Sequence, residues 1–408
     1  MFTVQQKIEH LKNLGFKGDL SQIERCYRGE QFDLSDANYQ KLLQESKKLC
    51  AEFTAMSKYL LNPLLKKDAE ERKAEILDTL FPGHGMIFGG GDGLEAVIGM
   101  VDVGNMVYIN VRNHFANNAL VTLNDYVFVA SNVNFGSTLP SDGRGQAQPI
   151  TVGANTWLCA NIDVAAGSHI GAKSVLGLGS VVTPASIIRD ETLAFGAPCQ
   201  SYKAITPDYV GKKLDKPFAW TEEEIKFLLA HARKLGVKDD LHDYVRMLNG
   251  EDYNCLTPGV GALHDLAHHL CSEYNDRATN DSRRQLILDM LFPIHGKNLT
   301  VGKDLYCDIV GATRMGKNVK IGDHVTLAGN IDIGNNVTIG DRVTLQCIGH
   351  RVYWEGRLLG YTPDQQPIEM NTSSAIKIRN GIKLRTGTKV KPGVEVRHNT
   401  NVDELLIK

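Results

Sequence analysis

A six-residue spacing of aliphatic side chains runs through residues 149 to 198. The residues on this spacing are Val152, Leu158, Val164, Ile170, Leu176 and Val182. A helix repeats its apolar residues every 3.6 positions and an exposed strand every second position, so neither element explains this step. The step is typical of a hexapeptide repeat, in which each repeat adds one short strand to a parallel β-helix. About three repeats complete a coil, and stacked coils bury an aliphatic core that no single repeat could form.

The same spacing returns in the second half of the sequence. Its first run consists of Ile321, Leu327, Ile333, Ile339 and Leu345. After an interruption, the step resumes at Ile378, Leu384, Val390, Val396 and Val402. The sequence therefore predicts two β-helices.

Segments ahead of the two β-helices also occur twice. The twenty residues that begin at Leu14 resemble those that begin at Leu235, a shift of 221 residues. LCAEF at Leu49 pairs with LCSEY at Leu270 at the same shift. These segments have helical periodicity, and capping boxes at Thr3/Gln6 and Thr221/Glu224 indicate where helices begin. We predict a mainly β protein that arose by tandem duplication, with helical prefaces at 1–82 and 220–293, β-helices at 83–205 and 294–408, and a linker at 206–219.

Length and composition set wider limits. The 408 residues suffice for two or three domains. A net charge of −2 with scattered Lys and Arg argues against the concentrated basic face that nucleic-acid binding requires. The charged N-terminal stretch does not read as a signal peptide, and no apolar run reaches the roughly 18 residues of a membrane span. The eight cysteines form no CxxC pair, which indicates reduced thiols in a cytoplasmic protein.

Several motifs together resemble the maltose and galactoside O-acetyltransferases. They are the segment from Arg246 to Asn254, the LFP that closes each preface, the rungs, CIGHRV from Cys347, and PITVGANTW with the later GAPCQSYK. The resemblance covers most of the chain, as two copies that are each incomplete in a different way. It implies left-handed β-helices and transfer of an acetyl group from acetyl-CoA, without a metal, to a sugar or another small hydroxylated acceptor. It also implies a homo-oligomer, such as a trimer, with sites between adjacent β-helices.

The transfer needs a general base for the attacking hydroxyl, and a neutral imidazole with a pKa near about 6.5 is suitable. The family has its base at the end of a rung, in a setting like TGHPV. The resemblance therefore makes His350 the base, with Arg351 where the family has Pro. The alternative is that His350 only ends a strand before a long loop. The first copy has Pro140 at the matching position and lacks this base.

The first copy keeps other parts of the family site. Tyr108 and Asn110 match its Tyr/Phe-x-Asn segment, whose Asn lies in the acceptor and acyl site. Trp157 matches the Trp of the coenzyme wall, although it could instead be an aromatic that only covers the core. The positions that line pantetheine or phosphates in the family correspond to Ala160, Leu178, Ser180, Thr183 and Lys203.

Asp33 and Tyr108 are the candidate residues for acceptor binding, and Asp33 depends on a separate match. The family holds its acceptor partly with an acidic residue soon after the element that matches residues 28–32. Asp33 could equally serve a turn near a helix N-terminus, ahead of Ser35, which is the commoner role of Asp in such a place.

The second copy has the opposite losses. Lys320 falls where the family Asn is expected, Lys383 replaces the Trp, and most of the coenzyme wall is missing. We therefore predict a composite site in which His350 of one copy faces Asn110 and Trp157 of the other, within or between chains. The alternative is a non-catalytic scaffold or regulatory subunit.

Two other pairs of residues carry weaker signals. His264 and His268 lie one helical turn apart, a spacing that suits a metal ion. No third ligand is evident in the sequence, so a solvated helix face is the favoured interpretation and no metal is expected. Cys347 lies near His350, but a Cys in a rung is more often a small packing residue.

Overall fold

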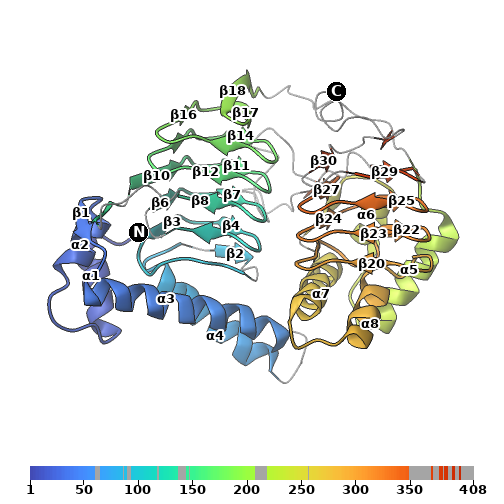
Figure 1. Ribbon diagram of the computed structural model, residues 1–408, viewed down its shortest axis with the longest axis horizontal. Helices are drawn as coiled ribbons and strands as arrows, with labels where there is room; N and C mark the ends of the chain where they lie inside the picture. The colour runs from blue at the N-terminus through green and yellow to red at the C-terminus, as the bar shows by residue number, and fades with distance from the viewer. Residues whose placement is uncertain are drawn as a thin grey trace. The chain divides into compact units, whose positions relative to one another are not determined.

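We describe a computed structural model of the chain. It describes residues 1–59, 65–85, 87–89, 93–116, 119–136, 144–146, 148–206, 218–255, 257–348, 369–370, 376–379, 381–384, 388–390 and 395–396. These residues fall into two compact units, the first ending at residue 206 and the second beginning at residue 218. Each unit combines helices with a stack of short parallel strands (Figure 1).

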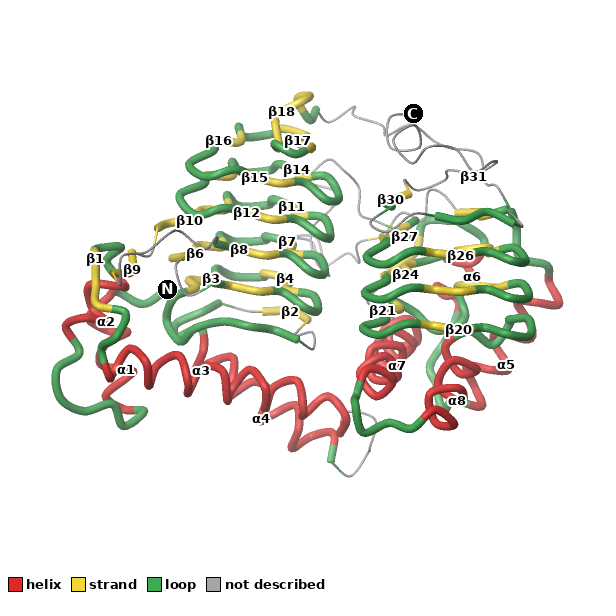
Figure 2. The backbone as a smooth tube through the Cα atoms, viewed as in Figure 1, coloured by secondary structure: helices red, strands yellow, loops and turns green. Residues whose placement is uncertain are grey.

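The first unit begins with helices α1 (Val4–Asn13), α2 (Ser21–Tyr27), α3 (Ala37–Met56) and α4 (Lys66–Leu80). The predicted capping box at Thr3 is confirmed, because its hydroxyl accepts from the Gln6 N–H while the Gln6 side chain accepts from the Thr3 N–H. Figure 2 shows α3 and α4 at the end of the strand stack where β2 lies. The helices close this end of the core.

Three sheets form the β-helix of the first unit. One contains β3 (Val101–Val103), β6 (Ala119–Leu123), β10 (Gln148–Val152), β13 (His169–Ile170) and β16 (Ile187–Ile188). The next contains β2 (Ile87–Gly89), β4 (Val107–Ile109), β7 (Phe128–Val129), β11 (Trp157–Leu158), β14 (Val175–Leu176), β17 (Thr192–Gly196) and the antiparallel β18 (Cys199–Ala204). The third contains β5 (His114–Phe115), β8 (Asn134–Phe135), β12 (Asp163–Val164) and β15 (Val181–Val182). The chain visits the three sheets in turn, so successive coils stack.

The second unit repeats this arrangement. Its helices are α5 (Glu222–Lys234), α6 (His242–Leu248), α7 (Pro258–Asn275) and α8 (Asp281–Leu291). Its sheets contain β20 (Thr300–Val301), β23 (Lys320–Ile321) and β26 (Thr338–Ile339); β21 (Tyr306–Cys307), β24 (Thr326–Ala328), β27 (Thr344–Gln346) and β30 (Lys389–Val390); and β22 (Thr313–Met315), β25 (Ile331–Ile333), β29 (Ile376–Ile378) and β31 (Glu395–Val396). The capping box at Thr221 and Glu224 is also confirmed.

Two small antiparallel pairs lie outside the stacks. β1 (Gln31–Asp33) pairs with β9 (Arg144–Gln146) in the first unit. β19 (Tyr253–Asn254) pairs with β28 (Glu369–Met370) in the second.

The six-residue step marks the buried core, as predicted. Val152, Leu158, Val164, Ile170, Leu176 and Val182 are each at most 1% exposed. In the second unit, Ile321, Leu327, Ile333, Ile339, Leu345, Ile378 and Leu384 are also buried. Burial of one such side chain stabilises a fold by about 1.5–3 kcal/mol, so the two aliphatic columns are a major part of what holds the coils together. Most of the predicted linker, residues 207–217, and the last rung at Val402 lie outside the described residues.

Contacts between helices and strands recur in both units. The Cys50 thiol accepts from the Ala96 N–H at 3.4 Å, and the Cys271 thiol accepts from the Cys307 N–H at 3.2 Å. A buried tyrosine in each unit donates to a main-chain carbonyl just before the first complete coil. These contacts allow positions in the two units to be matched independently of side-chain identity.

Candidate functional site

An outward-facing stripe crosses the seven-stranded sheet of the first unit. Tyr108, Phe128, Trp157, Val175 and Leu193 are register partners on β4, β7, β11, β14 and β17. Their strand neighbours enter the core, and side chains alternate between the two faces of a strand, so the stripe points away from the core. Tyr108 and Trp157 are partly exposed, and the Tyr108 and Phe128 ring centroids are 6.4 Å apart. Phe128 and Val175 are each only 3% exposed, so the accessible part of the stripe consists of the partly exposed Tyr108, Trp157 and Leu193.

A lysine stands at one end of the stripe. Lys203 on β18 is the register partner of Leu193 and is exposed. Strands in a sheet lie about 4.8 Å apart, which puts the main chain of Lys203 roughly 14 Å from that of Trp157. The surface thus runs from two aromatic side chains to a positive charge.

The corner beside this sheet gathers three further predicted residues. Asn110 directly follows β4, Ala160 lies in the turn after β11, and Leu178 lies one coil later in the turn after β14. The N–H of Gly179, beside Leu178, donates to the Ala160 carbonyl at 3.1 Å, which stacks the two turns. The Asn110 Oδ1 accepts from the Val111 N–H at 2.7 Å, and this bond fixes the side-chain amide at the corner.

Two of the predicted coenzyme residues occupy different settings. Ser180 is fully buried, and its hydroxyl donates to the Gly177 carbonyl at 2.6 Å, so the side chain supports the turn from inside. Burial raises the pKa of the neighbouring Cys199 thiol, although a hydrogen bond with Ser180 opposes this effect. Thr183 follows β15 at the next corner, where it is exposed and bonded to Ser186. The structure therefore does not bring Thr183 to the corner of Asn110.

Asp33 is separated from the stripe within its own unit. It ends β1, which lies on the opposite side of the first unit from β4 and β11 (Figure 1). Its carboxylate accepts from the Ser35 hydroxyl at 2.7 Å and the Ser35 N–H at 2.8 Å, and these bonds lower the pKa of Asp33. The N-cap of α3 is Asp36, so Asp33 holds the preceding turn.

The stripe has a charged counterpart in the second unit. Lys320, Thr338 and Lys383 are register partners on that face. They line an open groove together with Ile321, Gly322, Ile339, Gly340, Asp341 and Leu384. Two lysines thus take the places that aromatic residues hold in the first unit, and Lys383 corresponds to Trp157 as expected.

The predicted place of Lys320 is wrong by two residues. The corners before β4 and β23 are made by Met106 and Asn318, which have φ of 57° in both cases. Counting from these corners matches Lys320 with Tyr108, not with Asn110. Gly322 stands where the first unit has Asn110, so the second unit has no side-chain amide at this position.

His350 and Pro140 lie outside the described residues. The described chain reaches Ile348, directly after β27 and Cys347. The Cys347 thiol is buried and donates to the carbonyls of Ala328 and Asn330. The interpretation of Cys347 as a packing residue fits these contacts.

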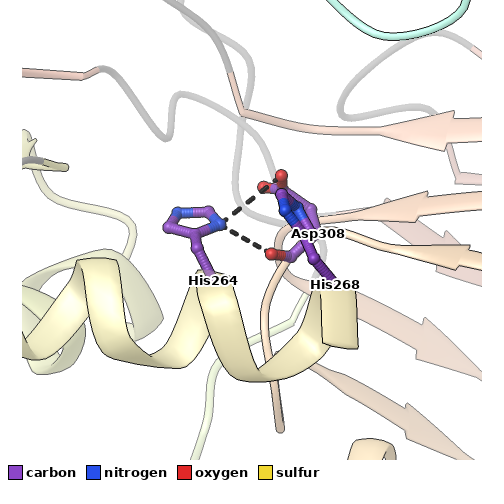
Figure 3. Close-up of side chains that lie close together, drawn as sticks. All are labelled: His264, His268 and Asp308. Atoms are coloured by element: carbon purple, nitrogen blue, oxygen red, sulfur yellow. Dashed lines mark hydrogen bonds and ion pairs between the residues drawn. The ribbon is translucent and has the colours of Figure 1, made fainter. Parts of the chain in front are cut away.

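His264 and His268 do not form a solvated helix face, so that prediction is wrong. Both residues are partly buried on α7, and Asp308 of the segment after β21 converges on them (Figure 3). One possible ligand atom of each residue lies within 4.8 Å of those of the other two. The His pair is visible in the sequence, but no sequence spacing points to Asp308, because packing of α7 on the β-helix brings it there.

Electrostatics bind this cluster together. The His264 Nδ1 lies 2.6 Å from the Asp308 carbonyl and 3.5 Å from the Asp308 carboxylate. Burial alone would lower the pKa of His264, but the Asp308 charge and hydrogen bonds raise it. Burial would likewise raise the pKa of Asp308, but the two imidazoles and the Tyr306 hydroxyl hold it below its ordinary value.

Known proteins share both the repeat and the preface of this chain. Residues 312–346 match the model described as bacterial transferase hexapeptide (six repeats), and residues 246–296 match the maltose acetyltransferase hexapeptide capping motif. A "Putative acetyltransferase" of Staphylococcus aureus (strain Mu50) is 32% identical over 192 residues, which are 44% of this chain and 91% of that protein. The chain belongs to the family of maltose and galactoside acetyltransferases. The predicted family and the predicted enzyme class, an acyltransferase, are thus confirmed.

Two further relatives of this acetyltransferase match over parts of its chain. Galactoside O-acetyltransferase of Escherichia coli (strain K12) is 31% identical over 112 residues, 26% of this chain. The match spans 54% of that protein, so about half of its length. The crystal structure of a maltose O-acetyltransferase from Clostridium difficile 630 is 27% identical to this chain, with a TM-score of 0.40. The match covers 45% of this chain and 97% of the chain in that crystal structure.

The described surface of this acetyltransferase offers two partly exposed aromatic side chains, Tyr108 and Trp157, with an exposed lysine and a fixed amide. A flat apolar wall suits an extended ligand with an apolar arm, and a lysine suits its anionic end. With Oδ1 engaged by Val111, the Asn110 NH₂ group is the part able to donate to a ligand oxygen. Among the described residues, no helix is both long and apolar enough to cross a lipid bilayer.

Proposed function

We propose that this enzyme transfers an acetyl group from acetyl-CoA to a hydroxyl of a sugar or another small hydroxylated acceptor. The observation that carries the proposal is the single register column that joins Tyr108 and Trp157 and ends at Lys203, beside the corner that holds Asn110. The name of the Escherichia coli relative, a galactoside O-acetyltransferase, supports a sugar hydroxyl as the acceptor.

Coenzyme binding is assigned to the first unit. Trp157 provides an apolar face for the pantetheine arm, Ala160 and Leu178 border the adjacent corner, and Lys203 offers a charge for phosphate. The buried Ser180 acts by holding its turn, and Thr183 contributes only if the ligand extends to the next corner.

The chemical step requires a base and an oxyanion donor. A ring nitrogen of His350 removes the proton of the acceptor hydroxyl as its oxygen attacks the thioester carbonyl carbon. The Asn110 amide donates to the oxyanion that develops on the carbonyl oxygen. The carbon–sulfur bond then breaks, the acetyl ester remains on the acceptor, and the proton carried by His350 passes to the coenzyme thiolate.

Each copy lacks a part of the site that the other copy has, which supports a composite site. The first copy has the wall and Asn110 with Pro140 at the base position, whereas the second has His350 with lysines and Gly322 at the wall and amide positions. The base of one copy would therefore serve the wall of the other, and Asp33 would reach an acceptor only from a neighbouring β-helix.

Two variants test this assignment. We expect His350→Ala to abolish acetyl transfer, measured as thiol release from acetyl-CoA over a panel of hydroxylated acceptors, while CoA binding by calorimetry persists. Loss of a general base typically costs about 10²–10⁴ in rate. We expect Trp157→Ala to weaken CoA binding, because it removes the flat wall. The exposed His324 and Phe227 offer matched controls, His324→Ala and Phe227→Ala, which should leave both quantities unchanged.

Full turnover by the His350→Ala enzyme would refute the assignment of the base. CoA binding without turnover on any acceptor, insensitive to His350, would instead support the scaffold alternative. That alternative is favoured by one observation, the replacement of the aromatic stripe by Lys320 and Lys383 in the second unit.

A further inference from the structure

The clearest unassigned site in the described residues is the His264, His268 and Asp308 cluster on the second unit. We propose that these three side chains bind a divalent transition-metal ion of the Zn²⁺ type. The site lies between α7 and the segment after β21, and it makes no use of the residues of the proposed acetyl-transfer site. The inference is therefore independent of the proposed function.

The donor set suits this class of metal. Two imidazoles and one carboxylate are common Zn²⁺ ligands, whereas Ca²⁺ and Mg²⁺ prefer oxygen ligands throughout. Donor atoms of a tetrahedral Zn²⁺ site, with bonds of about 2.0 Å, lie about 3.3 Å apart. The donor atoms of the cluster lie within 4.8 Å of one another; a bound ion would draw them closer, and ligation through the His264 Nδ1 would replace its contact with the Asp308 main-chain carbonyl.

An unsatisfied buried oxygen points to the same conclusion. Asp308 is 8% exposed, and within the described part of the chain its Oδ2 has no hydrogen-bond partner. A buried carboxylate oxygen without a partner is costly, because it has lost water without gaining a donor. A cation held between Asp308 and the two imidazoles would satisfy it (Figure 3).

Tyr306 supplies a supporting contact. Its hydroxyl donates to the Asp308 Oδ1 at 3.2 Å and lies 3.0 Å from the His268 Nε2. Groups that orient metal ligands through hydrogen bonds commonly change metal affinity about 10–100-fold. Tyr306 is therefore expected to be a positioning residue for this site.

The first unit shows that the fold does not require the cluster. The Cys50 and Cys271 thiols each accept from a main-chain N–H, that of Ala96 and that of Cys307, so residues can be counted from these two contacts. The positions of His264 and His268 hold Leu43 and Lys47 in the first unit, and the position of Asp308 holds Val97. The first unit thus packs its helix on its β-helix without any of the three ligands. This argues that the second unit does not keep them for packing alone.

The test uses the full-length protein after dialysis against a chelator. We expect calorimetric titration with Zn²⁺ to show one tight site per chain, and Co²⁺ to give the intense ligand-field absorption of a low-coordinate site. Absence of a thiolate-to-cobalt charge-transfer band distinguishes this site from binding by the free cysteines. We expect His264→Leu, which installs the residue of the first unit, and Asp308→Asn each to weaken Zn²⁺ binding by about 100-fold or more.

Two comparisons keep the test decisive. His242→Leu removes an exposed histidine from α6 of the same unit and should leave Zn²⁺ affinity unchanged. Tyr306→Phe keeps every ligand and should weaken Zn²⁺ binding about 10–100-fold, which provides a readout even if Asp308→Asn does not fold. The proposal is overturned if wild-type protein binds Zn²⁺ no more tightly than the His264→Leu protein, or if its Co²⁺ spectrum is that of a hexa-aqua ion.

Discussion

Ile187 and Ile188 are neighbours on β16, yet their side chains enter different environments. Ile188 continues the six-residue step and is 2% exposed, whereas Ile187 is 74% exposed. We expect Ile188→Ala to lower the free energy of unfolding by about 2–5 kcal/mol, because it removes buried methylene groups and leaves a cavity. Ile187→Ala, the matched control, should change it by less than about 0.5 kcal/mol. Urea unfolding of both variants measures the difference, and equal losses would contradict the inward assignment.

For single residues, the sequence predicts which side chains point into the core better than it predicts which side chains contact a ligand. The six-residue step decides burial locally, since each strand must alternate its side chains. Ser180 shows the limit: its residue type suits a ligand contact, but the turn geometry directs the hydroxyl to the Gly177 carbonyl. Asp33 shows the same, because its type fits both an acceptor ligand and the turn with Ser35 that the structure contains.

Arg314 connects the first helix of the second unit to its β-helix. Its guanidinium donates to both oxygens of Asp332 on β25, at 2.9 and 3.2 Å, and to Glu224 on α5 at 2.9 Å. Burial alone would raise the pKa of Glu224, but the Thr221 N–H bond and Arg314 hold it below the usual 4.5. Because the folded-state pKa is lowered, ionised Glu224 stabilises the fold fully above the ordinary glutamate pKa, and this stability is lost as the pH falls from there through the folded-state pKa.

Glu224→Gln separates the charge from the helix cap. Glutamine can still complete the capping box with its one carbonyl oxygen, and its NH₂ group then replaces the oxygen that accepts from Arg314, so the variant loses both the charge and this hydrogen bond. We expect the variant to be less stable than wild type by about 1 kcal/mol near neutral pH, with the difference shrinking as the pH drops below the usual glutamate value. Thermal unfolding across a pH series measures this. The exposed Glu222 provides the control, because Glu222→Gln should have almost no effect at any pH.

Two features of the structure could not be predicted from residue spacing in the sequence: the unequal coil lengths and the position of Asp308 beside α7. The coil step is regular at 18 residues between Lys320 and Thr338, but it is 20 residues between Tyr108 and Phe128. Because coils differ in length, the position predicted for Lys320, opposite Asn110, lies two residues from the observed one, opposite Tyr108. The convergence of Asp308 on α7 was likewise hidden, since helix packing and not local spacing creates it.

At the scale of the whole molecule, the two units share one architecture but carry different residues at matching positions of the candidate site. The first presents aromatic residues and a fixed amide where the second presents Lys320, Lys383 and Gly322. The second carries His350 in a family-like segment where the first carries Pro140. The proposed composite site rests on this division of residues between the two units.

Joint use across chains can be tested by complementation. If a base from one chain serves the wall of another, co-expressed His350→Ala and Trp157→Ala chains should assemble some sites that keep both residues. We expect such mixed oligomers, isolated with a different tag on each variant, to show more acetyl-transfer activity than oligomers of either variant alone, because His350→Ala lacks the base and Trp157→Ala binds CoA weakly. Oligomers that combine two differently tagged His350→Ala chains are the control and should stay inactive. No recovery in the mixed oligomers would exclude sites shared between chains and would place each working base and wall on a single chain.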